Sequence, residues 1–151
     1  MHAPPLHRRD LITGCLGGLW LVASGAAWAQ PKTLPADLAT QAQAVVQAQL
    51  DAFAADDARR AFLLASPSAR RHLGSPEHFI NLVRRRYAVV YRPASVTFLK
   101  PQWIEDKVVL GVQMTDARGT AWRATYTLER QADGHLLISG CELTEDDGLY
   151  T

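Results

Sequence analysis

The second half of the chain alternates between apolar and polar residues so regularly that its fold is narrowly constrained. Residues 107–115 and 120–130 repeat with a period of two, and their apolar positions are Val108, Leu110, Val112, Met114, Trp122, Ala124, Tyr126 and Leu128. This period is typical of a β-strand with one buried face. Asp133-Gly134 is a hairpin signal, so residues 135–143 are predicted to form the next antiparallel strand. Three such strands need a second layer that covers their apolar face.

The preceding stretch, residues 42–87, is predicted to supply that layer as three or four short helices. Asp37 is expected to cap a first helix from Leu38, whose apolar residues recur at steps of three and four while its glutamines occupy the remaining positions. Three further helix starts are marked by capping residues, namely the pair Asp56 and Asp57, Ser66-Pro67 and Ser75-Pro76-Glu77. Gly74 is predicted to end the third helix.

The order of these elements predicts an α+β fold in which N-terminal helices pack on a curved antiparallel sheet. One more strand is predicted between the helices and residue 107, marked by Val96, Phe98 and Trp103 and bent or ended by Pro101. With 151 residues and 48% hydrophobic content, the chain suits a single globular domain. The predicted division is a signal peptide (1–29), a linker (30–37), the domain (38–144) and an acidic tail (145–151).

The N-terminal segment has the three parts of a secretory signal peptide. Arg8 and Arg9 precede the apolar run 11–29, which closes with small residues at Ala27 and Ala29. This pattern predicts cleavage between Ala29 and Gln30 and an exported, periplasmic protein without a transmembrane span after processing. A membrane anchor is the weaker alternative, because glycines interrupt the run.

Two details of this segment bear on export and redox chemistry. Residues 8–12 resemble a twin-arginine signal, and general secretion remains the alternative. Cys15 ends a sequence like a lipoprotein box, but the apolar run follows this cysteine, so Cys15 is expected to be removed with the signal. Cys141 then lacks an intramolecular partner and is expected to be a buried apolar residue, with a reactive thiol as the alternative.

Charge is balanced overall but unevenly distributed. Removal of residues 1–29 leaves 14 basic and 14 acidic residues, so no nucleic-acid partner is predicted. Eight arginines and one acid lie between residues 59 and 92, whereas six acids and one base lie between 129 and 147. The two groups can pair within the fold or across a homodimer, or the arginines can form an anion-binding surface. That surface would consist of Arg59, Arg60, Arg70, Arg71, Arg84, Arg85, Arg86 and Arg92.

Common catalytic and metal-binding motifs are missing from the sequence. It has no phosphate-binding loop, no dinucleotide fingerprint and no zinc-protease motif, and His72, His78 and His135 are scattered. We therefore predict no metal and no cofactor. A pocket, if open, would be lined by the apolar strand face and by aromatic residues, namely Tyr87, Tyr91, Trp103, Trp122 and Tyr126. The alternative is that these rings fill the core.

Several motifs resemble those of an uncharacterised bacterial family, domain of unknown function 4864. They are Q-L-D-A-F at 49–53, A-F-x-x-A-S-P at 61–67, G-S-P-E-x-F at 74–79, V-Y-R-P-x-S-V at 90–96 and G-C-x-L at 140–143. The resemblance spans about residues 45–143 and implies no assigned activity. The order of elements also resembles the cone-like nuclear transport factor 2-like superfamily, which contains both isomerase-like enzymes and non-catalytic modules.

Three functions follow as hypotheses. The first is a non-catalytic periplasmic binding or interaction module, since no catalytic constellation is visible. The second is an isomerase- or dehydratase-like enzyme, which needs a carboxylate or histidine and an oxyanion donor such as Tyr87 or Tyr126 inside an apolar cone. The third is a protein that binds anions or lipid headgroups through the arginine surface.

Overall fold

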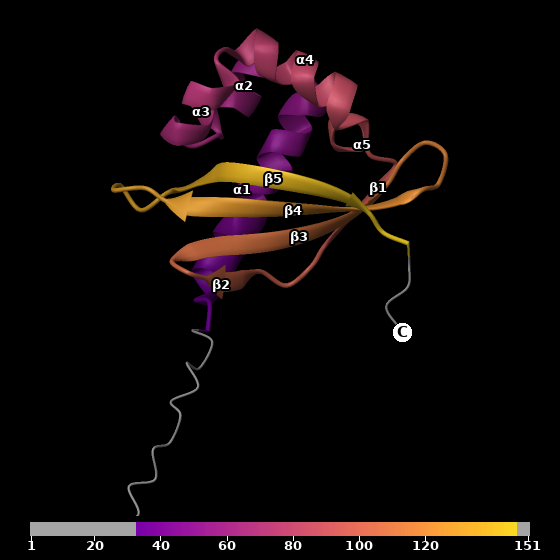
Figure 1. Cartoon of the computed structure of the whole chain (residues 1–151). Coiled ribbons are helices and arrows are strands. Elements are labelled where there is room, and N and C mark those ends of the chain that lie inside the picture. Colours follow the sequence, from indigo (N-terminus) through magenta and orange to yellow (C-terminus); the bar gives the residue numbers. More distant parts are fainter. Residues whose placement is uncertain (1–32, 148–151) are drawn as a thin grey trace, which may run out of the picture. The chain divides into compact units, whose positions relative to one another are not determined.

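The computed structural model describes residues 33–147 (Figure 1). The chain divides into two compact units, Met1–Gln30 and Pro31–Thr151, and every described helix and strand belongs to the second. The predicted signal peptide and its cleavage site between Ala29 and Gln30 lie outside the described residues. The same is true of residues 148–151 of the predicted acidic tail.

Five helices precede five strands. The helices are α1 (Ala36–Ala54), α2 (Ala58–Leu63), α3 (Pro67–Leu73), α4 (Pro76–Arg86) and α5 (Ala88–Tyr91). The strands are β1 (Ser95–Phe98), β2 (Gln102–Ile104), β3 (Lys107–Thr115), β4 (Ala121–Arg130) and β5 (Leu136–Glu145). Helices first and strands last is the predicted order, and the predicted α+β class is confirmed.

Side-chain caps start three of the helices as predicted. Asp57 accepts a hydrogen bond from the Arg60 amide at 3.1 Å, and Ser66 and Ser75 accept equivalent bonds at the starts of α3 and α4. The prediction for α1 was wrong. This helix begins at Ala36 after Pro35, which offers no capping side chain, and Asp37 lies in its first turn. A carboxylate there still favours the positive end of the helix dipole.

The five strands form one antiparallel sheet in the order β1-β3-β4-β5, with β2 paired to another part of β3. The single strand predicted before residue 107 is therefore two strands, β1 and β2. They pair with opposite ends of β3, as Val96 lies opposite Met114 and Trp103 opposite Val108. Pro101 lies between them, where its missing amide interrupts strand pairing. Strand β5 continues to Glu145, two residues beyond the predicted end.

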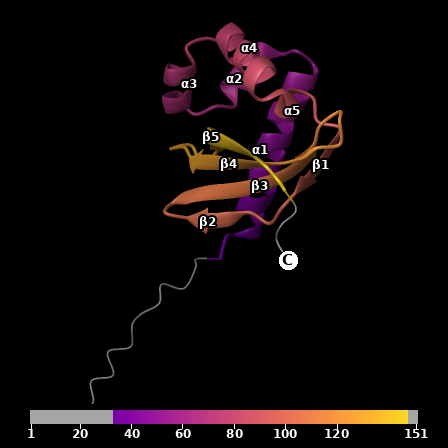
Figure 2. The same ribbon diagram turned by 45° about the vertical axis from the view of Figure 1, so that its right-hand side comes forward.

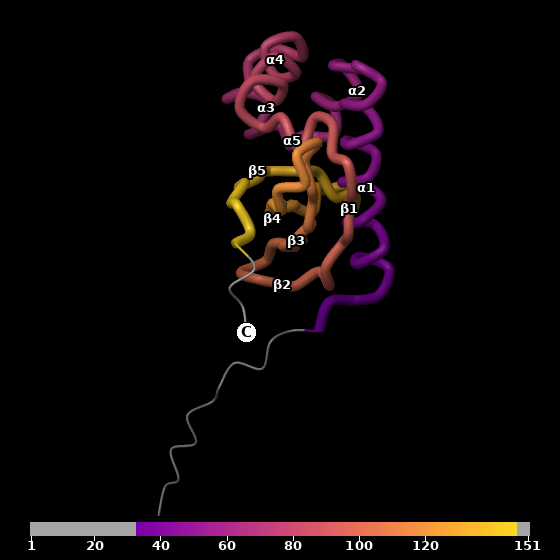
Figure 3. The backbone as a smooth tube through the Cα atoms, turned by 90° about the vertical axis from the view of Figure 1, so that its right-hand side faces the viewer, coloured from indigo at the N-terminus to yellow at the C-terminus, as the bar shows by residue number. Residues whose placement is uncertain are grey.

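Helix α1 runs along one face of the sheet. Helices α2 to α5 gather around the C-terminal end of α1, beyond strand β5 (Figures 1 and 2). Figure 3 shows the same arrangement edge-on, with α1 as a separate layer beside the strands. Leu110 and Leu128 from the sheet and Val46 and Phe53 from α1 are fully buried between the layers. The predicted apolar strand face is thus the face that α1 covers.

Candidate functional site

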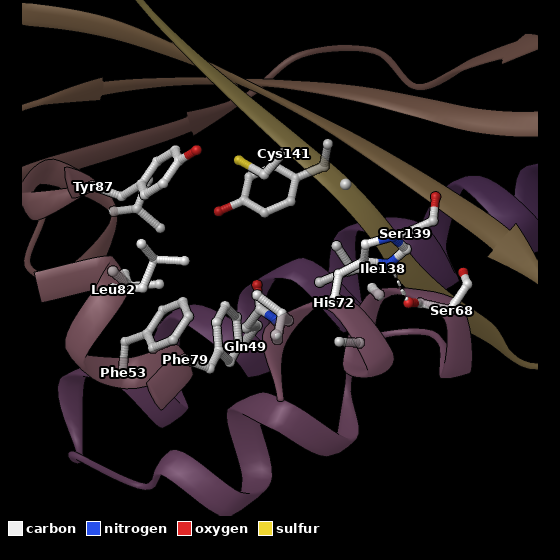
Figure 4. A pocket seen from close by; sticks show the side chains of 17 residues that line it. Gln49, Phe53, Ser68, His72, Phe79, Leu82, Tyr87, Ile138, Ser139 and Cys141 are labelled. Carbon is white, nitrogen blue, oxygen red and sulfur yellow. Dashed lines mark hydrogen bonds between the residues drawn. The ribbon is translucent and has the colours of Figure 1, made fainter. Parts of the chain in front are cut away.

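A cavity of about 410 Å³ lies where the helices meet the end of the sheet (Figure 4). Its walls come from α1, α3, α4 and α5 on one side and from β4 and β5 on the other. The apolar part of the wall consists of Phe53, Ala65, Ala69, Leu73, Phe79, Leu82, Val83, Val90 and Ile138. A cavity of this size and lining suits a small organic molecule.

Strand β5 shapes the sheet side of the cavity through an irregularity. The register between β4 and β5 shifts at Thr127 and Leu128, so that Ser139 is an extra residue in β5. Ser139 donates to the Thr127 carbonyl at 3.2 Å, and Ile138 exchanges backbone hydrogen bonds with the α2–α3 connection. Beyond this bulge, Cys141 lies opposite Tyr126, and both residues line the cavity.

Tyr126 carries the least satisfied polar group in the wall. Its side chain is 1% exposed, and its buried hydroxyl has no oxygen or nitrogen partner among the described residues, which leaves the neighbouring Cys141 sulfur as a weak partner. Burial, together with the neighbouring Cys141 thiol, raises the pKa of the Tyr126 phenol well above its ordinary value. The phenol is therefore neutral and able to donate. A buried hydroxyl without a partner costs about 1–3 kcal/mol.

Gln49 is the second buried polar group of the wall. Its side chain is 3% exposed, and its amide nitrogen donates to the Ala61 carbonyl at 3.1 Å. Because a carbonyl can only accept, this bond fixes which way the amide is turned. The Gln49 side-chain oxygen has no hydrogen-bond partner among residues 33–147 and remains an open acceptor.

The Cys141 thiol lies in an apolar setting. Burial raises its pKa to about 12, against a smaller lowering by Tyr126. A thiol with this pKa stays protonated, and the thiolate is the reactive form. This favours the expected role of Cys141 as a small wall residue over the alternative of a reactive thiol.

His72 stands at the exposed rim of the cavity. Its Nδ1 lies 2.9 Å from the Ser68 carbonyl, so Nδ1 carries the hydrogen in that contact. Neutral His72 then keeps a lone pair on Nε2. No aspartate or glutamate lines the cavity within the described part of the chain, and the same residues contain no cluster of His, Cys, Asp or Glu suited to a metal.

The structure separates the aromatic residues that the sequence grouped into one pocket. Tyr87 and Tyr126 both line the cavity. Trp122 lies elsewhere and donates from Nε1 to Asp116 at 3.0 Å, while Trp103 lines a separate hollow beside the start of α1. Tyr91 contacts Asp56 at a helix corner.

Asp56 organises that corner and engages two of the eight arginines. Its carboxylate accepts from Arg84 at 2.9 Å, from Arg92 at 3.2 Å and from the Tyr91 hydroxyl. The guanidinium carbons of Arg84 and Arg92 lie 5.2 Å and 4.8 Å from the centre of the Tyr91 ring, within cation–π range. The corner ties the α1–α2 turn to α4 and α5.

The other six arginines form no ion pair with any described residue. Five of them are exposed on α2, α3 and α4, namely Arg59, Arg60, Arg71, Arg85 and Arg86. Arg70 is half-buried, and its Nε is buried without a hydrogen-bond partner in the described part of the chain. Arg84 and Arg92 thus pair with Asp56, which lies outside the acidic group 129–147, and no described ion pair joins that group to the eight arginines.

The contacts of Asp56 predict how the stability of the protein depends on pH. The hydrogen bonds from Tyr91 and Arg84, aided by the charge of Arg92, lower the pKa of Asp56 below its ordinary value of 3.8. Because the pKa of Asp56 is lower in the folded state than in the unfolded state, the ionised carboxylate stabilises the fold at pH values above 3.8. This contribution is lost as the pH falls through the folded-state pKa. We expect Asp56→Asn to flatten the acid-induced fall of the melting temperature between about pH 5 and about pH 2.

Asparagine suits this test because Asp56 has a φ of +55°, a conformation that asparagine tolerates well. Asp133→Asn is the matched control, since hydrogen bonds from His135 lower the pKa of Asp133 but join only neighbouring residues. Equal acid profiles for Asp56→Asn and the wild type would contradict a stabilising role for the corner.

A family model described as Domain of unknown function (DUF4864) matches residues 36–151. The chain belongs to this family. The match includes all five helices, all five strands and every residue of the cavity wall. The DUF4864 chain is an α+β protein with five helices and a five-stranded antiparallel sheet within its described residues.

This chain is similar to three solved structures of low sequence identity. Aln2 from a Streptomyces species is 18% identical, with a TM-score of 0.49 over 78% of this chain and 97% of its own. A protein from Catenulispora acidiphila is 16% identical, with a TM-score of 0.49 over 75% of this chain and 94% of its own. A Catenulispora acidiphila structure in complex with S-DNPA is 17% identical, with a TM-score of 0.49 and coverages of 76% and 97%. No curated protein matches the chain.

Most wall residues of this DUF4864 chain were absent from the pocket predicted from sequence, and among them Gln49 carried a signal whereas Ser139 did not. Gln49 was assigned to the polar side of α1, yet it is spaced three residues from Val46 and four from Phe53, within the apolar stripe. A polar residue inside an apolar stripe is a candidate for a buried hydrogen-bonding group. Ser139 had no comparable signal, because its place in the wall depends on the β5 bulge.

Proposed function

We propose that this protein is a non-catalytic binding module that holds a small, largely apolar molecule in the cavity between its helices and its sheet. The observation that carries the proposal is a cavity of about 410 Å³ with apolar walls and a buried, unpaired tyrosine hydroxyl. Apolar pockets with a few convergent polar groups are typical of ligand sites.

The composition of the wall favours binding over isomerase or dehydratase chemistry. Such an enzyme needs a group that takes up a proton next to the reacting atom. No carboxylate lines the cavity within the described residues, and the pKa of the Cys141 thiol is about 12. His72 is the remaining candidate base of the described wall, and it lies at the exposed rim.

The proposed place of action is outside the cytoplasm, most simply the periplasm. This part of the proposal is supported by the signal-like segment 1–29 with its small residues before Gln30. Residues 33–147 contain no helix with the length and apolar character that crossing a membrane requires.

Filling the cavity provides the test. Ala69 lines the cavity from α3, and Ala69→Phe places a ring in that space. We expect the wild type to bind the uncharged fluorophore N-phenylnaphthylamine and Ala69→Phe to weaken this binding at least about tenfold, a loss of about 1.4 kcal/mol. Fluorescence titration measures the affinity, and thermal unfolding checks that the variant is folded.

Ala44→Phe is the matched control, because Ala44 is exposed on α1 and does not line the cavity. Its affinity for the fluorophore should equal that of the wild type. If Ala69→Phe and Ala44→Phe bind equally well, the fluorophore occupies another surface and the proposed site is wrong.

A further inference from the structure

We propose that the ligand is an uncharged, hydroxyl-bearing molecule whose hydroxyl accepts a hydrogen bond from Tyr126 and donates one to Gln49. This inference rests on the proposed binding function and names its ligand class. It is carried by two polar side chains that line the same cavity, each with one atom that has no oxygen or nitrogen partner among the described residues.

Tyr126 supplies the donor. Its ring belongs to the apolar core, where phenylalanine would pack equally well without an unsatisfied hydroxyl. Within the described core the hydroxyl has at most the weak contact with the Cys141 thiol, and its wall position makes it available to a bound molecule. A ligand oxygen that accepts a hydrogen bond from the Tyr126 hydroxyl removes the cost of leaving that hydroxyl unpaired. Such a ligand therefore binds more tightly than an analogue without the oxygen.

Gln49 supplies the acceptor. The bond from its nitrogen to the Ala61 carbonyl holds the amide in place from α1, on the helical side of the cavity, whereas Tyr126 approaches from β4. Figure 4 shows Gln49 and Cys141 on opposite walls. A hydroxyl group both accepts and donates, so it can serve donor and acceptor together, which an ether or a ketone cannot.

The absence of charge excludes an ionised ligand headgroup from the interior. The described wall contains no lysine, arginine, aspartate or glutamate, and a buried charge without a partner is strongly unfavourable. The exposed arginines lie on the helix surfaces and are not among the residues that line the cavity. The buried part of the ligand is therefore neutral.

Three probes of one shape test this inference, namely naphthol, naphthalene and naphthoate. Calorimetric titration should show the wild-type protein binding naphthol about tenfold more tightly than naphthalene, with naphthoate the weakest. Tyr126→Phe should weaken naphthol binding about tenfold and leave naphthalene binding unchanged, because only the hydroxyl partner is lost. The melting temperature of Tyr126→Phe should equal or exceed that of the wild type.

Tyr91→Phe is the matched control, since it removes the same hydroxyl from a tyrosine that contacts Asp56 and does not line the cavity. It should leave naphthol affinity within about twofold of the wild type. If naphthol and naphthalene bind equally and Tyr126→Phe changes neither, the inference is wrong and the binding function stands. Tightest binding of naphthoate would also overturn it. Failure of all three probes would overturn the proposed function itself.

Discussion

Replacement of Leu110 by alanine is expected to lower the free energy of unfolding by about 3 kcal/mol. Leu110 is fully buried on β3, on the sheet face that packs against α1. Truncation removes apolar contacts and leaves a void between two rigid layers, which cannot close around it. Urea unfolding monitored by circular dichroism measures the change.

Val109→Ala is the matched control on the same strand. Val109 is the next residue along β3, so its side chain points to the opposite face of the sheet, where it is only half-buried. This substitution should cost at most about 1 kcal/mol. Equal losses for Leu110→Ala and Val109→Ala would mean that both faces of β3 are buried, for instance by a second copy of the chain.

Phe53→Ala is expected to cost about 3 kcal/mol and to enlarge the cavity. Phe53 is 1% exposed near the end of α1, and its ring meets Phe79 of α4 edge to face with centroids 5.5 Å apart. It therefore links the long helix to the smaller helices around the cavity. The low end of the range for phenylalanine truncation applies, because part of the ring already faces open space.

Phe62→Ala provides the comparison, since Phe62 also approaches Phe79, with centroids 6.5 Å apart, but is only half-buried. We expect it to cost at least about 1 kcal/mol less than Phe53→Ala. The same unfolding measurement decides between them. A larger loss for Phe62→Ala would show that the small helices, rather than their attachment to α1, limit stability.

Much of the fold was predictable because its signals are local. Alternation identified β3 and β4, and Ser66 and Ser75 marked the starts of α3 and α4 to the residue. The error at Asp37 has a physical reason. A proline before a helix can start it without a capping side chain, so an acidic residue nearby is no proof of a cap.

The candidate site was predictable only in part. Tyr126 and Tyr87 were expected in a pocket from their aromatic character, and both line the cavity. Trp122 shows the same strand alternation as Tyr126, yet it lies at the start of β4, outside the cavity wall. There its indole donates a hydrogen bond to Asp116 of the preceding turn. The period of two along a strand shows which face of the sheet a side chain lies on. It does not show where along the strand a cavity will form.

The sequence by itself determined the class of this protein, since caps, turns and apolar periods depend on neighbours within a few residues. The tertiary structure alone decided which arginines meet Asp56, that the α1 helix carries Gln49 to the cavity, and that the Tyr126 hydroxyl has no oxygen or nitrogen partner among the described residues. These contacts join residues far apart in the chain. They exist because the layers pack at one particular separation, which leaves a space between α1, α4 and β5 that local patterns do not encode.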